Sequence, residues 1–249
     1  MKNITYQEIH KSSSVHFENE LYVHWHNPEF PDSYDSNCLE FKQQPSLTAF
    51  MEAETYLRKF HLKNGQQHVK FYFPQDGKPS QELLDYLGSQ GYSIGMTELY
   101  VLKPGQFIGR KAVEDIRITS VDDTNADPFL KMQYSQDRLY GETFAKQKQD
   151  LLKQQIQDPD RLMVMAYDEG TPAGFAEVII KEQTAEIDNL LVLEESRGKG
   201  IGTAIQQYVV NIFPDKMIIL VADGDDTPRQ MYKKQGYQYR GFRYEVQKI

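Results

Sequence analysis

The second half of the chain alternates short apolar stretches with polar and glycine-containing segments, a pattern that predicts strands separated by turns. The polar stretch from Asp168 to Pro172 predicts a hairpin between two of them. From Ile201 to Ile212, apolar residues recur on one helical face, and Pro214 ends the predicted helix. The expected strands cover residues 116–120, 162–167, 174–181, 185–193, 217–221 and 241–246, and two further helices cover residues 128–134 and 142–157.

This order of elements predicts the fold class. Hairpins join antiparallel strands, whereas a strand–helix–strand unit joins parallel ones. The sequence therefore predicts an α/β (α+β) fold, with a mixed, mostly antiparallel sheet that is flanked by helices.

The first half of the chain repeats part of this order. A Gln-Gly-Tyr triplet at residues 90–92 closes one helical stretch, and an identical triplet at residues 235–237 closes another. Each helical stretch lies between two predicted strands, those of the first half at residues 69–73 and 98–102. The shared order favours a duplicated fold, although three identical residues alone are compatible with chance similarity.

A domain boundary is predicted shortly after residue 100. Lys103, Pro104, Gly105 and Gln106 follow an apolar strand, and a Pro-Gly pair at that position is typical of the end of an element. We therefore predict a first domain at residues 1–104, a linker at residues 105–114 and a second domain at residues 115–249.

Composition narrows the class of protein. The 249 residues carry a net charge of −8, with 39% hydrophobic and 26% charged residues, which is typical of globular proteins. The acidic balance disfavours a nucleic-acid-binding module. The N-terminus lacks the apolar stretch of a secretory signal, and no apolar run approaches the ~18 residues of a membrane-spanning helix. With Cys38 as the one cysteine, we expect a soluble, cytoplasmic protein without disulfides.

All six histidines and Cys38 lie within the first 68 residues. A site in the second half must therefore work without imidazole or thiol groups. His24 and His26 flank Trp25 and would share one face of a strand, where they could join a metal site. Since no second pair of ligands has convincing spacing, aromatic packing is the favoured interpretation and no metal is expected. Cys38 is expected to be a small, buried or half-buried side chain.

The segment after the strand at residues 185–193 contains Gly198, Gly200 and Gly202. Glycines allow backbone N–H groups to converge on an anion, and a helix N-terminus favours negative charge. Arg197 and Lys199 add two cations. The segment predicts a phosphate site, and the alternative is a glycine-rich helix start with two solvated cations.

At this point the sequence resembles the GCN5-related N-acetyltransferase (GNAT) superfamily. Its first signature, Arg/Gln-x-x-Gly-x-Gly/Ala after an apolar strand, is matched by Arg197, Gly200 and Gly202. Its second signature, a helix that ends in Tyr-x-x-x-Gly-Phe/Tyr, is matched from Tyr232 to Tyr237. The resemblance covers residues 113–249.

The resemblance implies that acetyl-CoA is the cosubstrate and that the acetyl group passes directly to a primary amine, without an acyl-enzyme and without a metal. The pyrophosphate would lie on the backbone amides of the glycine-rich loop, and the pantetheine arm would pair with the preceding strand where that strand parts from its neighbour. The implied cosubstrate-binding residues are Leu191, Val192, Arg197, Gly198, Lys199, Gly200, Ile201, Gly202 and Thr203.

Catalytic roles also follow from the resemblance. Tyr232 corresponds to the tyrosine that protonates the CoA thiolate, and packing of an amphipathic helix is its alternative role. Glu186 and Asp188 lie on the strand where family members often place the base that deprotonates the amine, and they share one face by strand alternation. A solvated strand face is the alternative for both. Glu177, on the previous strand, is a further candidate.

One departure from the family concerns the loop before Tyr232. Many relatives carry asparagine about seven residues earlier, where this chain has Asp225. With Asp223 and Asp226 it would form an acidic rim that favours a cationic acceptor. A polar turn with a helix cap at Asp226 or Thr227 is the favoured alternative.

The first domain would be a degenerate acetyltransferase-like domain. The segment before its predicted helix at Ser46 contains neither glycine nor arginine, so we predict no phosphate site there. For the whole chain, the alternative function is a CoA-binding regulatory or interaction protein without turnover.

Overall fold

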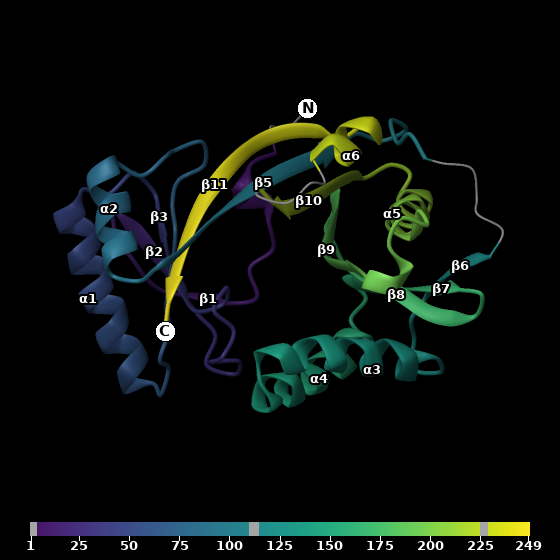
Figure 1. Cartoon of the computed structure of the whole chain (residues 1–249), viewed down its shortest axis with the longest axis horizontal. Helices are drawn as coiled ribbons and strands as arrows, with labels where there is room; N and C mark the ends of the chain where they lie inside the picture. The colour runs from purple at the N-terminus through teal and green to yellow at the C-terminus, as the bar shows by residue number, and fades with distance from the viewer. Residues whose placement is uncertain (1–3, 110–114, 225–228) are drawn as a thin grey trace. The chain divides into compact units, whose positions relative to one another are not determined.

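The computed structural model describes residues 4–109, 115–224 and 229–249 (Figure 1). The chain divides into two compact units. Unit 1 combines Met1–Leu99 with Ala222–Thr227 and Arg240–Ile249, and unit 2 combines Tyr100–Val221 with Pro228–Tyr239.

Unit 1 is a sheet covered by two helices (Figure 1). The parallel strands β3 and β4 are joined through α1, whose first turn is capped by the Ser46 side chain. The strand order is β1-β2-β3-β4-β11-β5. Its elements are η1 (Tyr6–Glu8), β1 (Ser14–Glu18), β2 (Tyr22–His26), β3 (Cys38–Phe41), α1 (Leu47–Lys63), β4 (Val69–Tyr72), α2 (Gln81–Ser89) and the first part of β5 (Ser93–Leu102).

Unit 2 has the strand order β11-β5-β10-β9-β8-β7-β6. Strands β6 to β9 form an antiparallel meander, and α5 joins β9 to the parallel strand β10. Its elements are β6 (Ile116–Ser120), α3 (Ala126–Asp137), η2 (Arg138–Tyr140), α4 (Glu142–Gln155), β7 (Arg161–Asp168), β8 (Thr171–Ile180), β9 (Thr184–Val192), η3 (Glu194–Ser196), α5 (Ile201–Ile212), β10 (Met217–Asp223), α6 (Arg229–Lys234) and the first part of β11 (Gln238–Lys248).

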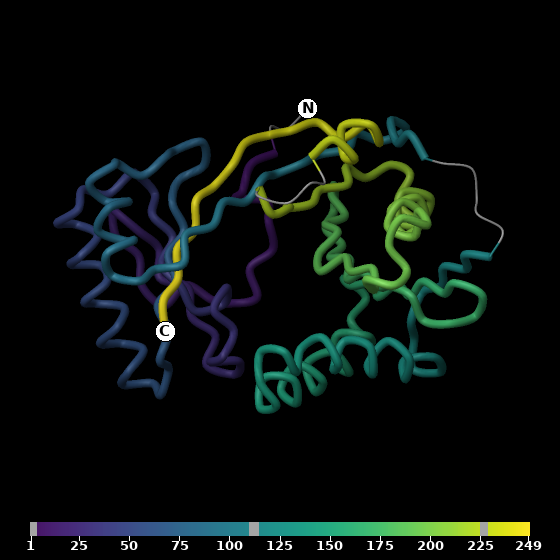
Figure 2. Tube along the Cα trace, in the orientation of Figure 1, coloured from purple at the N-terminus to yellow at the C-terminus, as the bar shows by residue number. Residues whose placement is uncertain are grey.

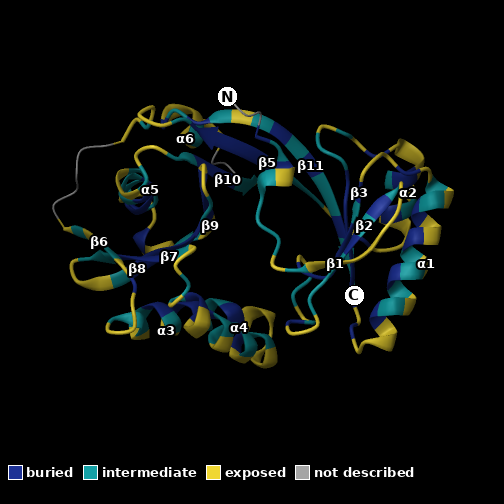
Figure 3. Cartoon of the chain, turned by 180° about the vertical axis from the view of Figure 1, so that it is seen from behind, coloured by how far each residue is buried: buried dark blue, intermediate teal, exposed yellow. Residues whose placement is uncertain are grey.

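Helices cover both faces of the unit 2 meander. Phe175 of β8 packs edge to face on Phe129 of α3, in a cluster that also contains Leu152 of α4. Ile201, on the other face, approaches Gly174 from α5. Figure 3 shows β7 and β8 as mostly buried and the outer surfaces of the helices as largely exposed. Burial on both faces explains why β8 is a nearly continuous apolar run.

Strands β5 and β11 each contribute residues to both units. Figure 2 follows the chain through both strands. In unit 1, β11 lies between β4 and β5, and in unit 2, β5 lies between β10 and β11. Most of β11, the last strand of the chain, thus completes the sheet of unit 1, and the last residues of β5 belong to the sheet of unit 2. The boundary predicted at residues 105–114 falls partly outside the described residues, and it stays a prediction.

The predicted fold class is confirmed. The two Gln-Gly-Tyr triplets, at residues 90–92 and 235–237, also have the same backbone structure. Gly91 and Gly236 have φ angles of 74° and 95°, the left-handed region that glycine adopts easily. After each, the tyrosine N–H reaches back to a carbonyl five residues earlier, from Tyr92 to Leu87 and from Tyr237 to Tyr232. Both helices thus end in a Schellman motif. Leu87 occupies in unit 1 the position that Tyr232 occupies in unit 2.

The predicted hairpin is also confirmed. Strands β7 and β8 pair antiparallel up to Asp168 and Thr171. Between them, Glu169 and Gly170 have φ angles of 49° and 82°. Positive φ at both central residues matches the right-handed twist of the strands, which explains the choice of glycine here.

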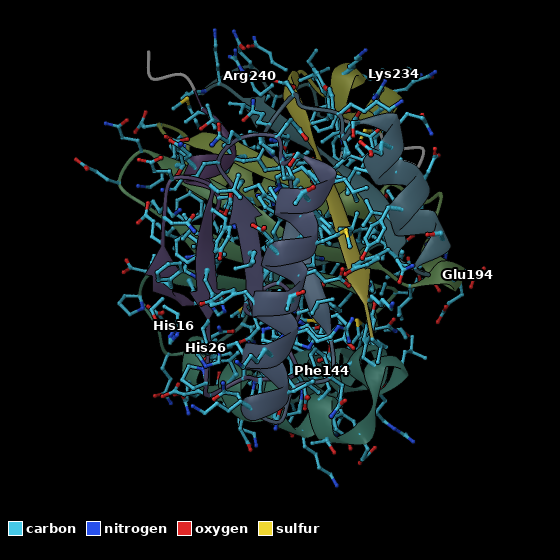
Figure 4. All side chains as sticks on the ribbon, turned by 90° about the vertical axis from the view of Figure 1, so that its left-hand side faces the viewer. His16, His26, Phe144, Glu194, Lys234 and Arg240 are labelled. Carbon is cyan, nitrogen blue, oxygen red and sulfur yellow. The ribbon has the colours of Figure 1, made fainter. Side chains whose placement is uncertain are left out.

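His16 and His26, which are labelled in Figure 4, belong to a cluster of histidine and aromatic rings in unit 1. His16 lies 5.0 Å from His24 and 5.9 Å from His26 between ring centroids, and Phe60 lies against all three. His24 bonds to the Tyr56 hydroxyl at 3.0 Å. Within the described ranges, no group of three or more histidine, cysteine or carboxylate side chains is arranged to hold a metal.

Cys38 is fully buried, as expected, and burial raises the pKa of its thiol to about 12. The described helices include none with the length and hydropathy to cross a membrane.

Candidate active site

The sheet of unit 2 opens between β9 and β10. Their parallel pairing runs from Thr184 and Met217 to Ile187 and Leu220, and β9 then continues to Val192 without β10 beside it. This parting of parallel strands leaves backbone groups of β9 available to a ligand that adds as a further strand.

Two irregularities mark this opening. Asn189 has a φ of 47°, which is rare for a residue within a strand. The pairing of β8 with β9 shifts register between Phe175 and Glu177, as in a β-bulge. Beyond the shift, β8 lies so close to β9 that a Cβ on Gly174 would come within 2.6 Å of the Leu191 carbonyl oxygen. The last residues of β9 therefore follow a direction different from its first part.

The glycine-rich loop leads from this opening into α5. Gly198 and Gly200 have φ angles of 79° and 89°, and a Cβ on either would meet no atom within 4 Å. Gly200 precedes the first helical residue and has no side chain to cap it. The first N–H groups of α5 have no partner within the helix, so they can bind an anion.

The two cations of the loop have different surroundings. The Arg197 Nε donates to the Val192 carbonyl oxygen at 3.3 Å, which ties the loop to the end of β9. The Lys199 Nζ lies 2.6 Å from Asp168 Oδ2, and this hydrogen bond raises the pKa of Lys199. Both cations are exposed, so a phosphate group can approach them from solvent.

Helix α6 is tied to the start of α5. Gln235, which is 4% exposed, donates from Nε2 to the Thr203 hydroxyl at 3.0 Å. Tyr232 lies three residues earlier, with its ring 5.0 Å from Tyr100 and 5.6 Å from Tyr237. A Cβ on Gly236 would come within 2.3 Å of the Gln106 carbonyl oxygen, so glycine is required there.

A buried polar cluster lies on the face of the sheet that α3 and α4 cover. Glu177 is 2% exposed, and its Oε1 accepts hydrogen bonds from Gln133 Nε2 at 2.7 Å and from Asn189 Nδ2 at 2.9 Å. The Lys148 Nζ of α4 lies 3.5 Å from the same oxygen. This carboxylate is therefore compensated by three donors from three different elements.

Asp137 extends this cluster. It is 8% exposed, and its Oδ2 has no hydrogen-bond partner among the described residues. Desolvation, with a smaller contribution from the Glu177 charge, raises the pKa of Asp137 to about 6. The Lys148 charge acts in the opposite direction. A carboxyl group that titrates near neutral pH is suited to proton transfer.

The two predicted base candidates lie on the same face of the sheet as Glu177. Asp188 pairs directly across from Glu177, and Glu186 pairs across from Ile179. Glu186 is 5% exposed, whereas Asp188 is exposed. Their roles, like those of Tyr232 and the loop residues, stay predictions.

Sequence reasoning did not identify Asn189, Gln133, Lys148 or Asp137. Asparagine tolerates a positive φ, but nothing around Asn189 in the sequence marks a turn. Gln133 and Lys148 lie on predicted helices where polar residues are common. Asp137 lies beyond the end of the helix predicted at residues 128–134, because α3 continues to that residue. The departure at Asp225 and the cap at Asp226 or Thr227 fall outside the described residues, and Asp223 ends β10.

Comparisons with known proteins agree with this geometry. A family model described as "Acetyltransferase (GNAT) family" matches residues 129–237, and one described as "Domain of unknown function (DUF5613)" matches residues 4–100. No curated protein matches the chain.

Solved structures resemble the whole chain. A functionally unknown conserved protein from Staphylococcus epidermidis ATCC 12228 is 32% identical, with a TM-score of 0.89 over 98% of this chain and 97% of that one. A GCN5-related N-acetyltransferase from Kribbella flavida has a TM-score of 0.62 at 14% identity, over 95% of this chain and 89% of that one.

A tandem GNAT protein from the clavulanic acid biosynthesis pathway has a TM-score of 0.53 at 12% identity, over 85% of this chain and 74% of that one. At such identities, the two GNAT structures show the fold. The family model, with the fold that these structures share, shows that the chain carries a domain of the GCN5-related N-acetyltransferase superfamily, together with an additional N-terminal domain.

Proposed function

We propose that the chain is an N-acetyltransferase that moves the acetyl group of acetyl-CoA directly to a primary amine. The observation that carries this proposal is the opening between β9 and β10, which continues into an uncapped, glycine-rich start of α5. One part offers strand-like backbone to an extended pantetheine arm, and the other offers N–H groups to a pyrophosphate.

The cosubstrate would be held by nine residues in this proposal. Leu191 and Val192 pair with the pantetheine arm, and the backbone of the loop binds the pyrophosphate. Arg197 and Lys199 add charge at the rim, where their exposure makes the contribution sensitive to salt. The loop residues are Arg197, Gly198, Lys199, Gly200, Ile201, Gly202 and Thr203.

The reaction needs a neutral amine, a polarised thioester carbonyl and a proton for the leaving thiolate. In the proposed step, the amine nitrogen bonds to the acetyl carbon and the carbon–sulfur bond breaks. The amine loses one proton to a carboxylate or a water relay, and the Tyr232 hydroxyl gives a proton to the CoA sulfur. No covalent intermediate on the protein is required.

The base is proposed among the carboxylates of one sheet face. Glu186 and Asp188 stay the candidates next to the strand opening. Asp137 joins them, because its raised pKa lets it accept a proton near neutral pH. Glu177 is held by three donors, which suits a residue that positions its neighbours.

A thermal-shift titration with acetyl-CoA tests the cosubstrate site. At a ligand concentration 100-fold above Kd, linkage stabilises a protein by about 2.7 kcal/mol, or roughly 5–10 °C for a domain of about 150 residues. Gly200→Glu should abolish this shift, because it places a carboxylate at the pyrophosphate site. Gly65→Ala is the matched control, since Gly65 also has a positive φ and open space around it but ends α1 in unit 1.

Turnover of acetyl-CoA against a panel of amines then separates the enzyme from a CoA-binding protein. Release of free thiol that requires an amine and falls in Tyr232→Phe supports the transferase. Cosubstrate binding without thiol release from any amine would favour the regulatory or interaction protein. A flat thermal response in folded protein would contradict both functions.

A further inference from the structure

Unit 1 contains a cavity of about 730 Å³ at the carboxyl ends of its parallel strands. Pairing of β3 with β4 ends at Glu40 and Tyr72. The cavity is lined by the next residue of each segment, Phe41 at the end of β3 and Phe73 after β4. The carboxyl ends of parallel strands are a common place for ligands, because the strands part there and leave backbone and side chains exposed.

A buried cation forms one wall of this cavity. The Arg243 side chain is 7% exposed, and its guanidinium stacks on Tyr72 at 3.9 Å and on Tyr6 at 4.4 Å. One of its nitrogens lies 3.4 Å from Glu40 Oε1, whereas Nε has no hydrogen-bond partner. This guanidinium therefore keeps donor capacity that the protein does not use.

A second cation faces the same carboxylate. The Lys11 Nζ lies 2.8 Å from Glu40 Oε2, and the same oxygen accepts a hydrogen bond from Trp25 Nε1 at 3.0 Å. Glu40 is thus fully engaged by three donors, and two cations share its one negative charge. An additional cation would compete with Lys11 and Arg243 for the Glu40 oxygens, whereas an additional anion would meet both cations.

The other charged groups of the wall have ion-pair or hydrogen-bond partners within the protein. The Lys42 Nζ lies 2.6 Å from Glu18 Oε1. Asp76 Oδ1 accepts the backbone N–H of Phe242 at 3.0 Å, and its other oxygen accepts from Gln75 at 3.3 Å. The wall as a whole carries as many cations as carboxylates, and Lys11 and Arg243 are the two cations that share a single carboxylate, Glu40.

The cavity does not have the features that hold a pyrophosphate in this fold. Residues 42–45, before α1, contain no glycine. The Ser46 hydroxyl also accepts the Ala49 N–H at 3.2 Å, so the protein itself uses a donor of the first turn. In unit 2, by contrast, Gly198 and Gly200 precede α5, and no side chain caps its first turn. A ligand of this cavity therefore differs in chemistry from acetyl-CoA.

We propose that this cavity binds a small organic carboxylate with an aromatic or apolar body. The carboxylate lies against Arg243 and Lys11, and the body packs on Trp25 and Val23, which line the cavity. Charge-assisted hydrogen bonds to a guanidinium and an ammonium supply the specificity, and the apolar side chains exclude water. The proposal does not depend on the acetyltransferase function of unit 2.

The chain offers a reporter at this site, because Trp25 is its one tryptophan and it lines the cavity. Tryptophan fluorescence is titrated with benzoate, phenylacetate and 3-phenylpropionate, and in parallel with neutral phenylacetamide and cationic phenethylamine. We expect a saturable change for at least one carboxylate. That carboxylate should bind roughly tenfold more tightly than phenylacetamide, the size of one charge-assisted hydrogen bond.

Lys11→Met is the primary variant, because Lys11 lies at the rim whereas Arg243 packs into the core. It should weaken the carboxylate by roughly tenfold and leave phenylacetamide unchanged. Lys42→Met, which removes a compensated cation from the same wall, should change affinity less than about twofold. Circular dichroism confirms the fold of both variants. Equal binding of the three charge types, no saturable response to any carboxylate, or an unaltered affinity in Lys11→Met would overturn the proposal.

Discussion

Asn189 donates a hydrogen bond to the buried carboxylate of Glu177 at 2.9 Å, and Asn189 is also the residue of β9 with a φ of 47°. The backbone irregularity and the side-chain contact therefore have one cause. The left-handed conformation redirects β9 where it leaves β10 and turns the amide toward Glu177. A positive φ is tolerated better by asparagine than by most residues with a side chain.

Substitutions at Asn189 separate the two effects. Asn189→Gly keeps the backbone conformation and loses the hydrogen bond, so it should cost about 1–2 kcal/mol of unfolding free energy. Asn189→Ala loses the bond and adds about 1–2 kcal/mol of left-handed strain. Urea denaturation measures both. Equal losses for the two variants would show that the backbone of β9 does not require the positive φ.

The raised pKa of Asp137 makes unit 2 less stable above pH 6. The unfolded carboxyl ionises near pH 4, whereas the folded one holds its proton to about pH 6. The folded state thus binds more protons in this interval, and stability falls as pH rises through it. Asp137→Asn should raise the unfolding free energy by about 2–3 kcal/mol at pH 7.5 and have little effect at pH 4. Chemical denaturation at both pH values provides the test, and a gain that does not depend on pH would contradict it.

The histidines of unit 1 predict acid sensitivity of the opposite sign. Burial lowers the pKa of His24 to about 3 and that of His68 to about 4, whereas unfolded histidines titrate near pH 6.5. The folded state stays neutral there while the unfolded state takes up protons, so stability falls as pH decreases below 6.5. Each histidine contributes about 1.4 kcal/mol per pH unit.

Denaturation between pH 6.5 and pH 5 measures this effect in an Asp137→Asn background, because Asp137 itself titrates near pH 6 with the opposite sign. Carboxylates such as Glu40, whose pKa is lowered by Lys11 and Arg243 against desolvation, titrate below this interval. His24→Leu should reduce the slope of stability against pH by about one half if His24 and His68 dominate it. An unchanged slope in that variant would assign the acid sensitivity to other groups.

Gly174 and Gly202 should respond in opposite ways to alanine. A Cβ at Gly174 would collide with the Leu191 carbonyl oxygen at 2.6 Å, which should cost about 1–3 kcal/mol or more. At Gly202 the nearest side-chain atoms lie at 3.7 Å and 3.8 Å, and alanine favours the helix by up to about 1 kcal/mol. Thermal unfolding without ligand compares the two. A loss at both positions would indicate that the start of α5 also lacks space.

The elements that sequence reasoning identified are those with a local cause. Pro214 and the two Gln-Gly-Tyr triplets end helices through their own backbone preferences, and the hairpin at Glu169 and Gly170 is set by φ. The glycine-rich loop was identifiable for the same reason, because its chemistry lies within six consecutive residues.

The parts that were missed depend on contacts between distant segments. Gln133, Lys148 and Asn189 converge on Glu177 from α3, α4 and β9, and nothing in their local sequence distinguishes them from surface residues. The cavity of unit 1 likewise combines Lys11 with Arg243, which are separated by most of the chain. Such sites require the register of the sheet, which periodicity does not provide.

The sharing of β5 and β11 between the two units has a consequence for folding during synthesis. A fragment that ends at residue 104 lacks residues 240–249, and with them the strand between β4 and β5. The complementary fragment lacks Tyr100–Leu102. Neither fragment contains every strand segment of its unit. Unit 1 can therefore complete its sheet only after nearly the whole chain has been synthesised. Exchange of one half for a foreign domain would leave an open strand edge on the other half.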